Sequence, residues 1–199
     1  MNDPKKLIVD WWPPLALALV CIAAQALNGV EALRYERMLV GEQPWRLVSG
    51  QLVHLGWNHL LLNLAGLLMI WLLFGHTIQP WAWGAAFVMC SLAVSGGLYL
   101  RDTDLIWYVG LSGVLHGMLV IGALATLSSE RYRALLLLTV VAAKLTMEQL
   151  SGASSATAEL VGGAVIVNAH LYGALGGLAC APLVLLGRRF LQQGFRELR

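Results

Sequence analysis

Long apolar stretches separated by short polar connections dominate the chain. A helix that crosses a bilayer needs about 20 mostly apolar residues. Stretches of that kind lie at about 11–30, 53–75, 81–100, 110–127, 134–151 and 162–186. Polar and charged residues gather between them. The pattern therefore predicts an all-α, polytopic membrane protein built as a bundle of six transmembrane helices.

Composition supports the membrane prediction and narrows the domain count. Hydrophobic residues make up 58% of the 199 residues and charged residues only 12%, against about 25% charged in an average soluble domain. Mean hydropathy is +0.70. We expect a single membrane domain over 1–199, without an internal repeat. The net charge of +2 does not suggest a nucleic-acid partner, and Cys21, Cys90 and Cys180 lie in apolar stretches that suggest no disulfide framework.

The distribution of basic residues predicts the orientation in the membrane. Six spans would place both termini on one side, which has few acids and carries Lys5, Lys6, Arg131, Arg133, Arg188, Arg189, Arg196 and Arg199. On the other side, acidic residues dilute the arginines. The positive-inside rule then predicts cytoplasmic termini. The apolar run after Lys6 extends to about Asn28, so we expect a retained first helix and not a cleaved signal peptide.

Polar residues inside the apolar stretches form three groups. Each such residue is costly in hydrocarbon and suggests a function. The groups are His54, Asn58, His59 and Asn63; Gly110-Leu111-Ser112-Gly113 with His116; and Asn168 with His170, followed by Gly173 and Gly177. In the predicted topology all three lie toward the outer face, with His170 about eight residues, or roughly 12 Å, into its helix. We expect them to meet in one outward-opening cavity.

Ser112 is the candidate nucleophile. It lies between glycines at a predicted helix start, where unpaired backbone N–H groups can stabilise an oxyanion. The simpler alternative is a helix cap with closely packed glycines. The nucleophile elbow GxSxG of soluble hydrolases is not matched, because Gly113 follows the serine directly.

His170 is the candidate base. It lies one turn before Gly173, and Gly173 with Gly177 forms a GxxxG pair that lets another helix approach closely. Contact with the Ser112 helix would place the imidazole beside the hydroxyl, as a Ser–His dyad that needs no third, acidic group. A histidine bonded to a backbone carbonyl is the alternative.

His59 and Asn63 are four residues apart and share one helical face. Both can donate a hydrogen bond to an oxyanion, although interhelical hydrogen bonds would explain them too. We expect His54 to face elsewhere and to bond to loop backbone near Trp45 and Arg46.

Lys144 and Glu148 are four residues apart, a spacing that allows an ion pair. They either extend to the membrane interface or bind substrate at a lateral opening. A metal site is not expected, because the chain has no HExxH motif and Glu148 is the one acid within a predicted span.

Taken together, the ordered motifs resemble the rhomboid intramembrane proteases from about residue 45 to 177. They are Trp45-Arg46, His54, His59, Asn63, Gly110-Leu111-Ser112-Gly113, Ala169-His170, Gly173 and Gly177. The resemblance implies a six-helix fold in which Ser112 is the nucleophile and His170 the general base. It implies an oxyanion hole made by His59, Asn63 and the Ser112 N–H.

The same resemblance implies partners and surroundings. The Trp45-Arg46 loop would lie partly in the outer leaflet, and the helix at 134–151 would act as the substrate gate. The substrate would be a single-span membrane protein in the lipid bilayer. Neither a metal nor a cofactor is implied.

One departure from the family pattern narrows the resemblance. Many rhomboids have a tyrosine four residues after the serine, where this chain has His116 in Gly-Leu-Ser-Gly-Val-Leu-His-Gly. That run resembles the rhombosortase branch of Gram-negative bacteria. The likeness implies an inner-membrane enzyme, open to the periplasmic side, that cuts exported proteins near a Gly-Gly motif in a C-terminal sorting tail.

Several alternatives stay open. His116 either supports His170 or competes with it for Ser112, and we favour His170 as the base. The acyl-enzyme could be hydrolysed by water or transferred to a small amine. A catalytically inactive rhomboid-like protein that binds and escorts clients is the non-enzyme alternative.

Overall fold

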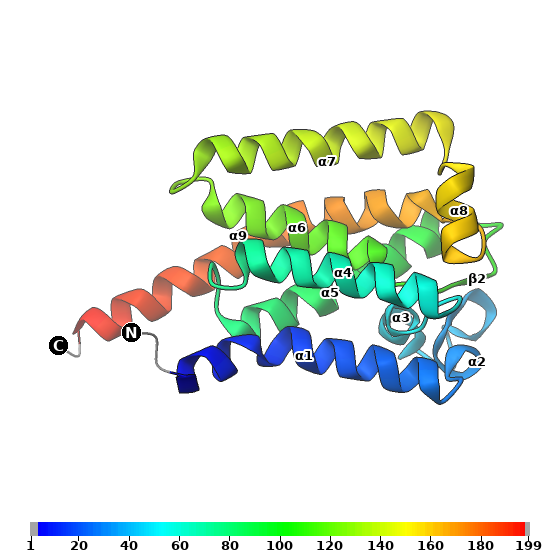
Figure 1. Ribbon diagram of the computed structural model, residues 1–199, viewed down its shortest axis with the longest axis horizontal. Helices are drawn as coiled ribbons and strands as arrows, with labels where there is room; N and C mark the ends of the chain where they lie inside the picture. The colour runs from blue at the N-terminus through cyan, green and yellow to red at the C-terminus, as the bar shows by residue number, and fades with distance from the viewer. Residues whose placement is uncertain (1–3, 198–199) are drawn as a thin grey trace.

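A bundle of long helices forms the body of the molecule. The computed structural model describes residues 4–197, with side chains described for 11–185. The long helices are α1 (Pro4–Ala26), α4 (Trp57–Phe74), α5 (Pro80–Arg101), α6 (Ser112–Thr126), α7 (Arg131–Ser151) and α9 (Val167–Glu197). Figure 1 shows α6 and α9 side by side in the middle of the bundle, with α7 along one edge and α1 along the opposite edge.

Four of these helices are long and apolar enough to cross a membrane, namely α4, α5, α7 and the Val167–Leu185 part of α9. Two shorter apolar helices, Trp11–Ala26 and α6, complete the set in the described part of the chain. The all-α, polytopic membrane fold is therefore confirmed. Within the described residues four helices have the length and hydropathy of a full span, so the count of six spans stays a prediction. Helix α6 is short because it begins only at Ser112, after an extended segment.

Most helix boundaries agree with the prediction to within about four residues. Two helices differ more, since α1 begins at Pro4 and α9 covers Val167–Glu197 instead of 162–186. The late start of α9 has a local cause. Gly162 adopts φ +83° at the end of a preceding short helix, a conformation that favours glycine and interrupts a right-handed helix.

Short elements gather at one end of the bundle, opposite the start of α1 and the end of α9 (Figure 1). Between α1 and α4 lie α2 (Val30–Leu33), β1 (Tyr35–Glu36), η1 (Arg37–Leu39), α3 (Arg46–Ser49) and η2 (Gly50–Leu52). Strand β2 (Trp107–Tyr108) pairs antiparallel with β1, and α8 (Ser155–Val161) joins α7 to α9. The sequence predicted only connections here, because elements of two to seven residues carry too little periodicity to be recognised.

Two arginines fix this end of the bundle. The buried Arg46 guanidinium donates to the Arg34 carbonyl at 2.7 Å. The Arg37 guanidinium donates to the carbonyls of Leu98 and Asp102, each at 2.7 Å. Both carbonyls lie at the C-terminal end of α5, so Arg37 ties the last turn of α5 to the segment between α1 and α4.

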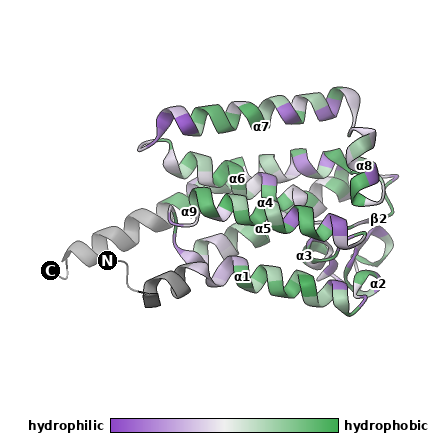
Figure 2. Cartoon of the chain, in the orientation of Figure 1, coloured by the Kyte–Doolittle hydropathy of each residue, from purple (hydrophilic) through white to green (hydrophobic). Residues whose placement is uncertain are grey.

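Large hydrophobic side chains are exposed along the outer faces of the long helices. They include Leu61, Leu68 and Leu72 of α4, Leu136, Val140 and Met147 of α7, and Leu175, Leu178 and Leu183 of α9. Figure 2 shows hydrophobic residues along most of α1 and α4, with hydrophilic residues concentrated near helix ends and connections. Exposed apolar surface on this scale is unusual for a soluble monomer and suits contact with lipid.

Candidate active site

Glycines set the distance between α6 and α9. A Cβ atom on Gly173 would overlap the carbonyl of Gly113, and one on Gly177 would overlap the carbonyl of Gly117. Small residues at this spacing allow two helix backbones to approach closely. Gly113 also faces the Ala169 carbonyl, where an added Cβ would lie 2.7 Å from the oxygen. The first turns of α6 and α9 therefore lie against each other.

This crossing brings Ser112 and His170 into contact. Ser112 is the first residue of α6, and its Oγ lies 2.9 Å from His170 Nε2. The His170 side chain is buried. Its expected place about eight residues into its helix is wrong, because α9 begins at Val167 and His170 belongs to the first turn.

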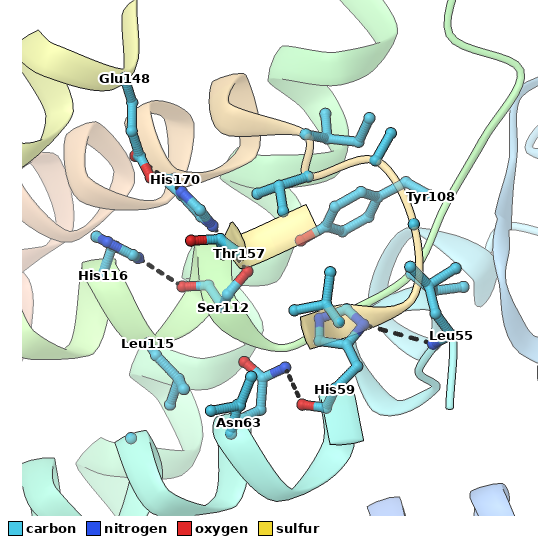
Figure 3. Close-up of a pocket in the computed structure, with 18 of the residues that line it drawn as sticks. Leu55, His59, Asn63, Tyr108, Ser112, Leu115, His116, Glu148, Thr157 and His170 are labelled. Carbon is cyan, nitrogen blue, oxygen red and sulfur yellow. Dashed lines mark hydrogen bonds and ion pairs between the residues drawn. The ribbon is translucent and has the colours of Figure 1, made fainter. Parts of the chain in front are cut away.

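A cavity of about 910 Å³ surrounds the pair. The side chains singled out in the sequence that line it are His59, Asn63, Ser112, His116, Lys144, Glu148 and His170. They come from α4, α6, α7 and α9, and residues of the 104–109 and 157–166 segments also line the cavity. The three polar groups of the sequence thus contribute to one cavity. Figure 3 shows His59 and Asn63 on the side of Ser112 opposite His170.

His59 and Asn63 lie on the cavity-facing side of α4. His59 Nδ1 accepts a hydrogen bond from the Leu55 N–H at 3.4 Å, which places the proton of a neutral ring on Nε2. Asn63 Nδ2 donates to the His59 carbonyl at 3.0 Å, so its second N–H is left for another acceptor. The Ser112 N–H lies in the first turn of α6, where N–H groups have no intrahelical acceptor.

Gly110 shapes the approach to Ser112. Its φ is +122°, and an added Cβ would lie 2.8 Å from His59 Cε1. The Gly110 N–H donates to the Gly50 carbonyl at 3.1 Å, and the Gly110 carbonyl accepts from the Tyr108 hydroxyl at 2.8 Å. Burial raises the pKa of Tyr108, so the phenol stays protonated and able to donate. Only glycine combines this backbone conformation with close contact to an imidazole ring.

His116 packs directly on His170. The two rings stack with centroids 4.4 Å apart and planes at 20°. His116 Nδ1 lies 2.7 Å from the carbonyl oxygen of Ser112, and it must donate because a carbonyl only accepts. The Ser112 hydroxyl contacts His170 instead. This geometry favours a supporting position for His116 over competition for the serine.

Comparison with known families shows which family the chain belongs to. The sequence model of the Rhomboid domain matches residues 41–187, well over half of the chain. The chain belongs to the rhomboid family. Members of this family are generally intramembrane serine proteases that act on membrane-protein substrates within the bilayer. A search of curated proteins gave no match.

His54 of this rhomboid does not make the bond predicted for it. Within the part of the chain that the structure describes, neither ring nitrogen of His54 has a hydrogen-bond partner. Instead the ring meets His59 edge-on, with centroids 5.0 Å apart. The expectation that the two histidines face apart was wrong because His54 precedes α4, so helical spacing does not apply. Of the two residues expected near His54, Trp45 is half exposed and Arg46 donates a hydrogen bond to the Arg34 carbonyl.

Lys144 and Glu148 form the ion pair that their spacing allows, with Nζ and Oε1 2.6 Å apart. The other Glu148 oxygen, Oε2, lies 2.9 Å from His170 Nδ1. Sequence reasoning missed this contact because the two residues belong to different helices. One available signal was that a carboxylate within a membrane helix needs a partner.

Among the described residues, no three His, Cys, Asp or Glu side chains are grouped to hold a metal ion.

Proposed function

We propose that this rhomboid is an active serine endopeptidase that cleaves single-span membrane proteins near the outer face of the membrane. The observation that carries the proposal is the 2.9 Å contact between Ser112 Oγ and His170 Nε2 in a cavity large enough for a peptide segment. A hydroxyl beside an imidazole is the pairing that activates a serine nucleophile.

The proposed reaction follows from the direction of each group. His170 Nε2 accepts the proton of the Ser112 hydroxyl while Oγ attacks the substrate carbonyl. His59, Asn63 and the Ser112 N–H donate to the oxyanion that develops. His170 then protonates the leaving amine, and water that enters through the cavity releases the acyl group from Ser112 with His170 again as base.

Removal of the Asn63 amide tests the proposed oxyanion hole. We expect Asn63→Ala to lower kcat by about 10²-fold to 10³-fold, the usual cost of losing one oxyanion donor, with little change in KM. Asn58→Ala is the matched control, because Asn58 is exposed on the same helix and should keep wild-type kcat. Kinetics on a purified single-span reporter would measure both. An Asn63→Ala enzyme as fast as Asn58→Ala would remove Asn63 from the oxyanion hole.

For the substrate we propose the rhombosortase-like class, with a Gly-Gly motif in a C-terminal sorting tail. His116 supports this proposal because it stacks on His170 at the position where many rhomboids have tyrosine. Lys144 and Glu148 remain candidate substrate contacts, since both line the cavity.

We propose a single domain over 1–199 in a bacterial inner membrane, with cytoplasmic termini and a periplasmic opening. Two observations support this orientation. The start of α1 and the end of α9 lie at one end of the bundle, and α8 and β2, whose residues help to line the cavity, lie at the other (Figure 1). The basic residues near both ends of the sequence favour the cytoplasmic side for the end of the bundle that holds the start of α1 and the end of α9.

A pair of reporters tests the substrate class. One carries a Gly-Gly motif before an apolar segment and a basic end, and the other has Val-Val in place of Gly-Gly. In proteoliposomes we expect the Gly-Gly reporter to have a kcat/KM at least about tenfold higher, because a site that selects glycine rejects branched side chains beside the scissile bond. Equal cleavage of both would contradict the Gly-Gly proposal. Mass spectrometry of the product separates hydrolysis, which leaves a free carboxylate, from transfer to an amine.

A further inference from the structure

Glu148 reaches the cavity from α7, and its two oxygens have different partners. Oε2 lies 2.9 Å from His170 Nδ1, and Oε1 accepts from Lys144 Nζ at 2.6 Å. The Glu148 side chain is 14% exposed, against 46% for Lys144. Figure 3 shows His170 between Glu148 and Ser112.

We propose that Glu148 is a positioning residue that acts through His170, so that the site is a Ser112–His170–Glu148 triad and not a dyad. The inference rests on the proposed function, because it needs Ser112 and His170 to be the reacting pair. It assigns to α7 a part in the chemistry in addition to its place in the cavity wall.

The carboxylate determines which nitrogen of His170 carries the proton. A neutral imidazole has one N–H, and an ionised carboxylate can only accept. Nδ1 must therefore hold the proton that is shared with Glu148, which leaves the Nε2 lone pair facing the Ser112 hydroxyl 2.9 Å away. When His170 takes the serine proton it becomes a cation, and the adjacent carboxylate stabilises that charge.

Two other roles for Glu148 fit the contacts less well. Substrate binding alone would not explain the contacts of Glu148, because one oxygen is bound to His170 and the other to Lys144 within the protein itself. A simple tether between α7 and α9 would not require contact with the one imidazole nitrogen that faces away from Ser112. Packing already holds α7, because Val141 and Leu145 lie against Val120 and Ala174.

The ion pair between Lys144 and Glu148 leads to a further testable consequence of the proposal. In Glu148→Gln the ammonium of Lys144, which only donates, would take the amide oxygen. The amide NH₂ would then face His170 Nδ1 and force the proton onto Nε2, where it blocks transfer from Ser112. With Lys144→Met added, the amide can turn and offer its oxygen to Nδ1. The second substitution should therefore restore part of the activity lost in the first.

The experiment measures kcat and KM for a single-span reporter in proteoliposomes with Glu148→Gln, Lys144→Met and the double variant. We expect Glu148→Gln to lower kcat by about 10⁴-fold with KM within about threefold, as for loss of the acid in other serine triads. The double variant should regain at least about tenfold in kcat over Glu148→Gln. Glu159→Gln is the matched control, since Glu159 is an exposed acid on α8 and should keep wild-type kcat.

Two results would overturn the triad. One is a Glu148→Gln kcat within about tenfold of wild type, and the other is a double variant no faster than Glu148→Gln. A second measurement does not depend on folding of the variants: ¹⁵N NMR of histidine-labelled wild type should show the His170 proton on Nδ1. A neutral ring with its proton on Nε2 would contradict the proposal.

Ser112→Ala, assayed in parallel, separates this inference from the proposed function. If wild type cleaves the reporter, Ser112→Ala does not and Glu148→Gln keeps its kcat, the protease proposal stands and the triad is wrong. If wild type cleaves no better than Ser112→Ala, the protease proposal itself fails.

Discussion

Replacement of Ser112 or His170 with alanine is expected to lower kcat by about 10⁴-fold or more, because each substitution removes half of the pair that forms and breaks the acyl bond. The two side chains lie 2.9 Å apart, and the Ser112 hydroxyl is a weak nucleophile without a base. Cleavage of a single-span reporter in proteoliposomes measures the loss. Since both residues act in one step, the double variant should be no slower than the slower single variant.

Matched controls come from the same residue types outside the cavity. Ser128→Ala and His76→Ala change an exposed serine and an exposed histidine, and both should keep wild-type kcat. A His170→Ala enzyme that retained a tenth or more of the activity would contradict the assignment of His170 as the base, and would direct attention to His116.

Gly173→Ala is the second substitution expected to have a large effect, although the residue makes no contact with the cavity. Its new methyl group would overlap the Gly113 carbonyl, so α9 must move away from α6. Overpacking of this kind typically costs about 1–3 kcal/mol of stability. Displacement of reacting groups by about 1 Å can cost about 10²-fold in rate. We expect kcat to fall by about that factor, because His170 lies one turn away on the same helix.

Thermal unfolding and reporter kinetics together measure this effect. Gly84→Ala is the control, because a Cβ at Gly84 would have no heavy atom within 4 Å and alanine favours the helix. That variant should be as active and at least as stable as wild type. Wild-type kcat in Gly173→Ala would show that the close crossing of α6 and α9 is not what holds His170 against Ser112.

The apolar pattern was sufficient to predict the helices, because a membrane helix needs a long apolar run whatever it packs against. It could not predict α8 or the pairing of β1 with β2, which depend on contacts between distant segments. The start of α9 was misplaced for a local reason, the left-handed conformation of Gly162. Composition alone does not distinguish such a glycine from one inside a helix.

The candidate site was predictable where residue type and spacing carry the information. The GxxxG pair of Gly173 and Gly177 pointed to the helix contact that brings Ser112 and His170 together. His54 was misplaced because it was treated as part of a helix. The contact of Glu148 with His170 was missed because spacing within α7 shows only the neighbour Lys144. Contacts between side chains of different helices depend on how the helices rotate and cross, which the sequence of each helix does not state.

Fluorophosphonate labelling of the purified protein, with the modified residue located by mass spectrometry, tests most directly the central claim that His170 activates Ser112. We expect labelling of wild type at Ser112, none in Ser112→Ala, and labelling at least about 10²-fold slower in His170→Ala. Labelling that survives Ser112→Ala, or an unreactive wild-type protein, would contradict the claim and favour a client-binding role.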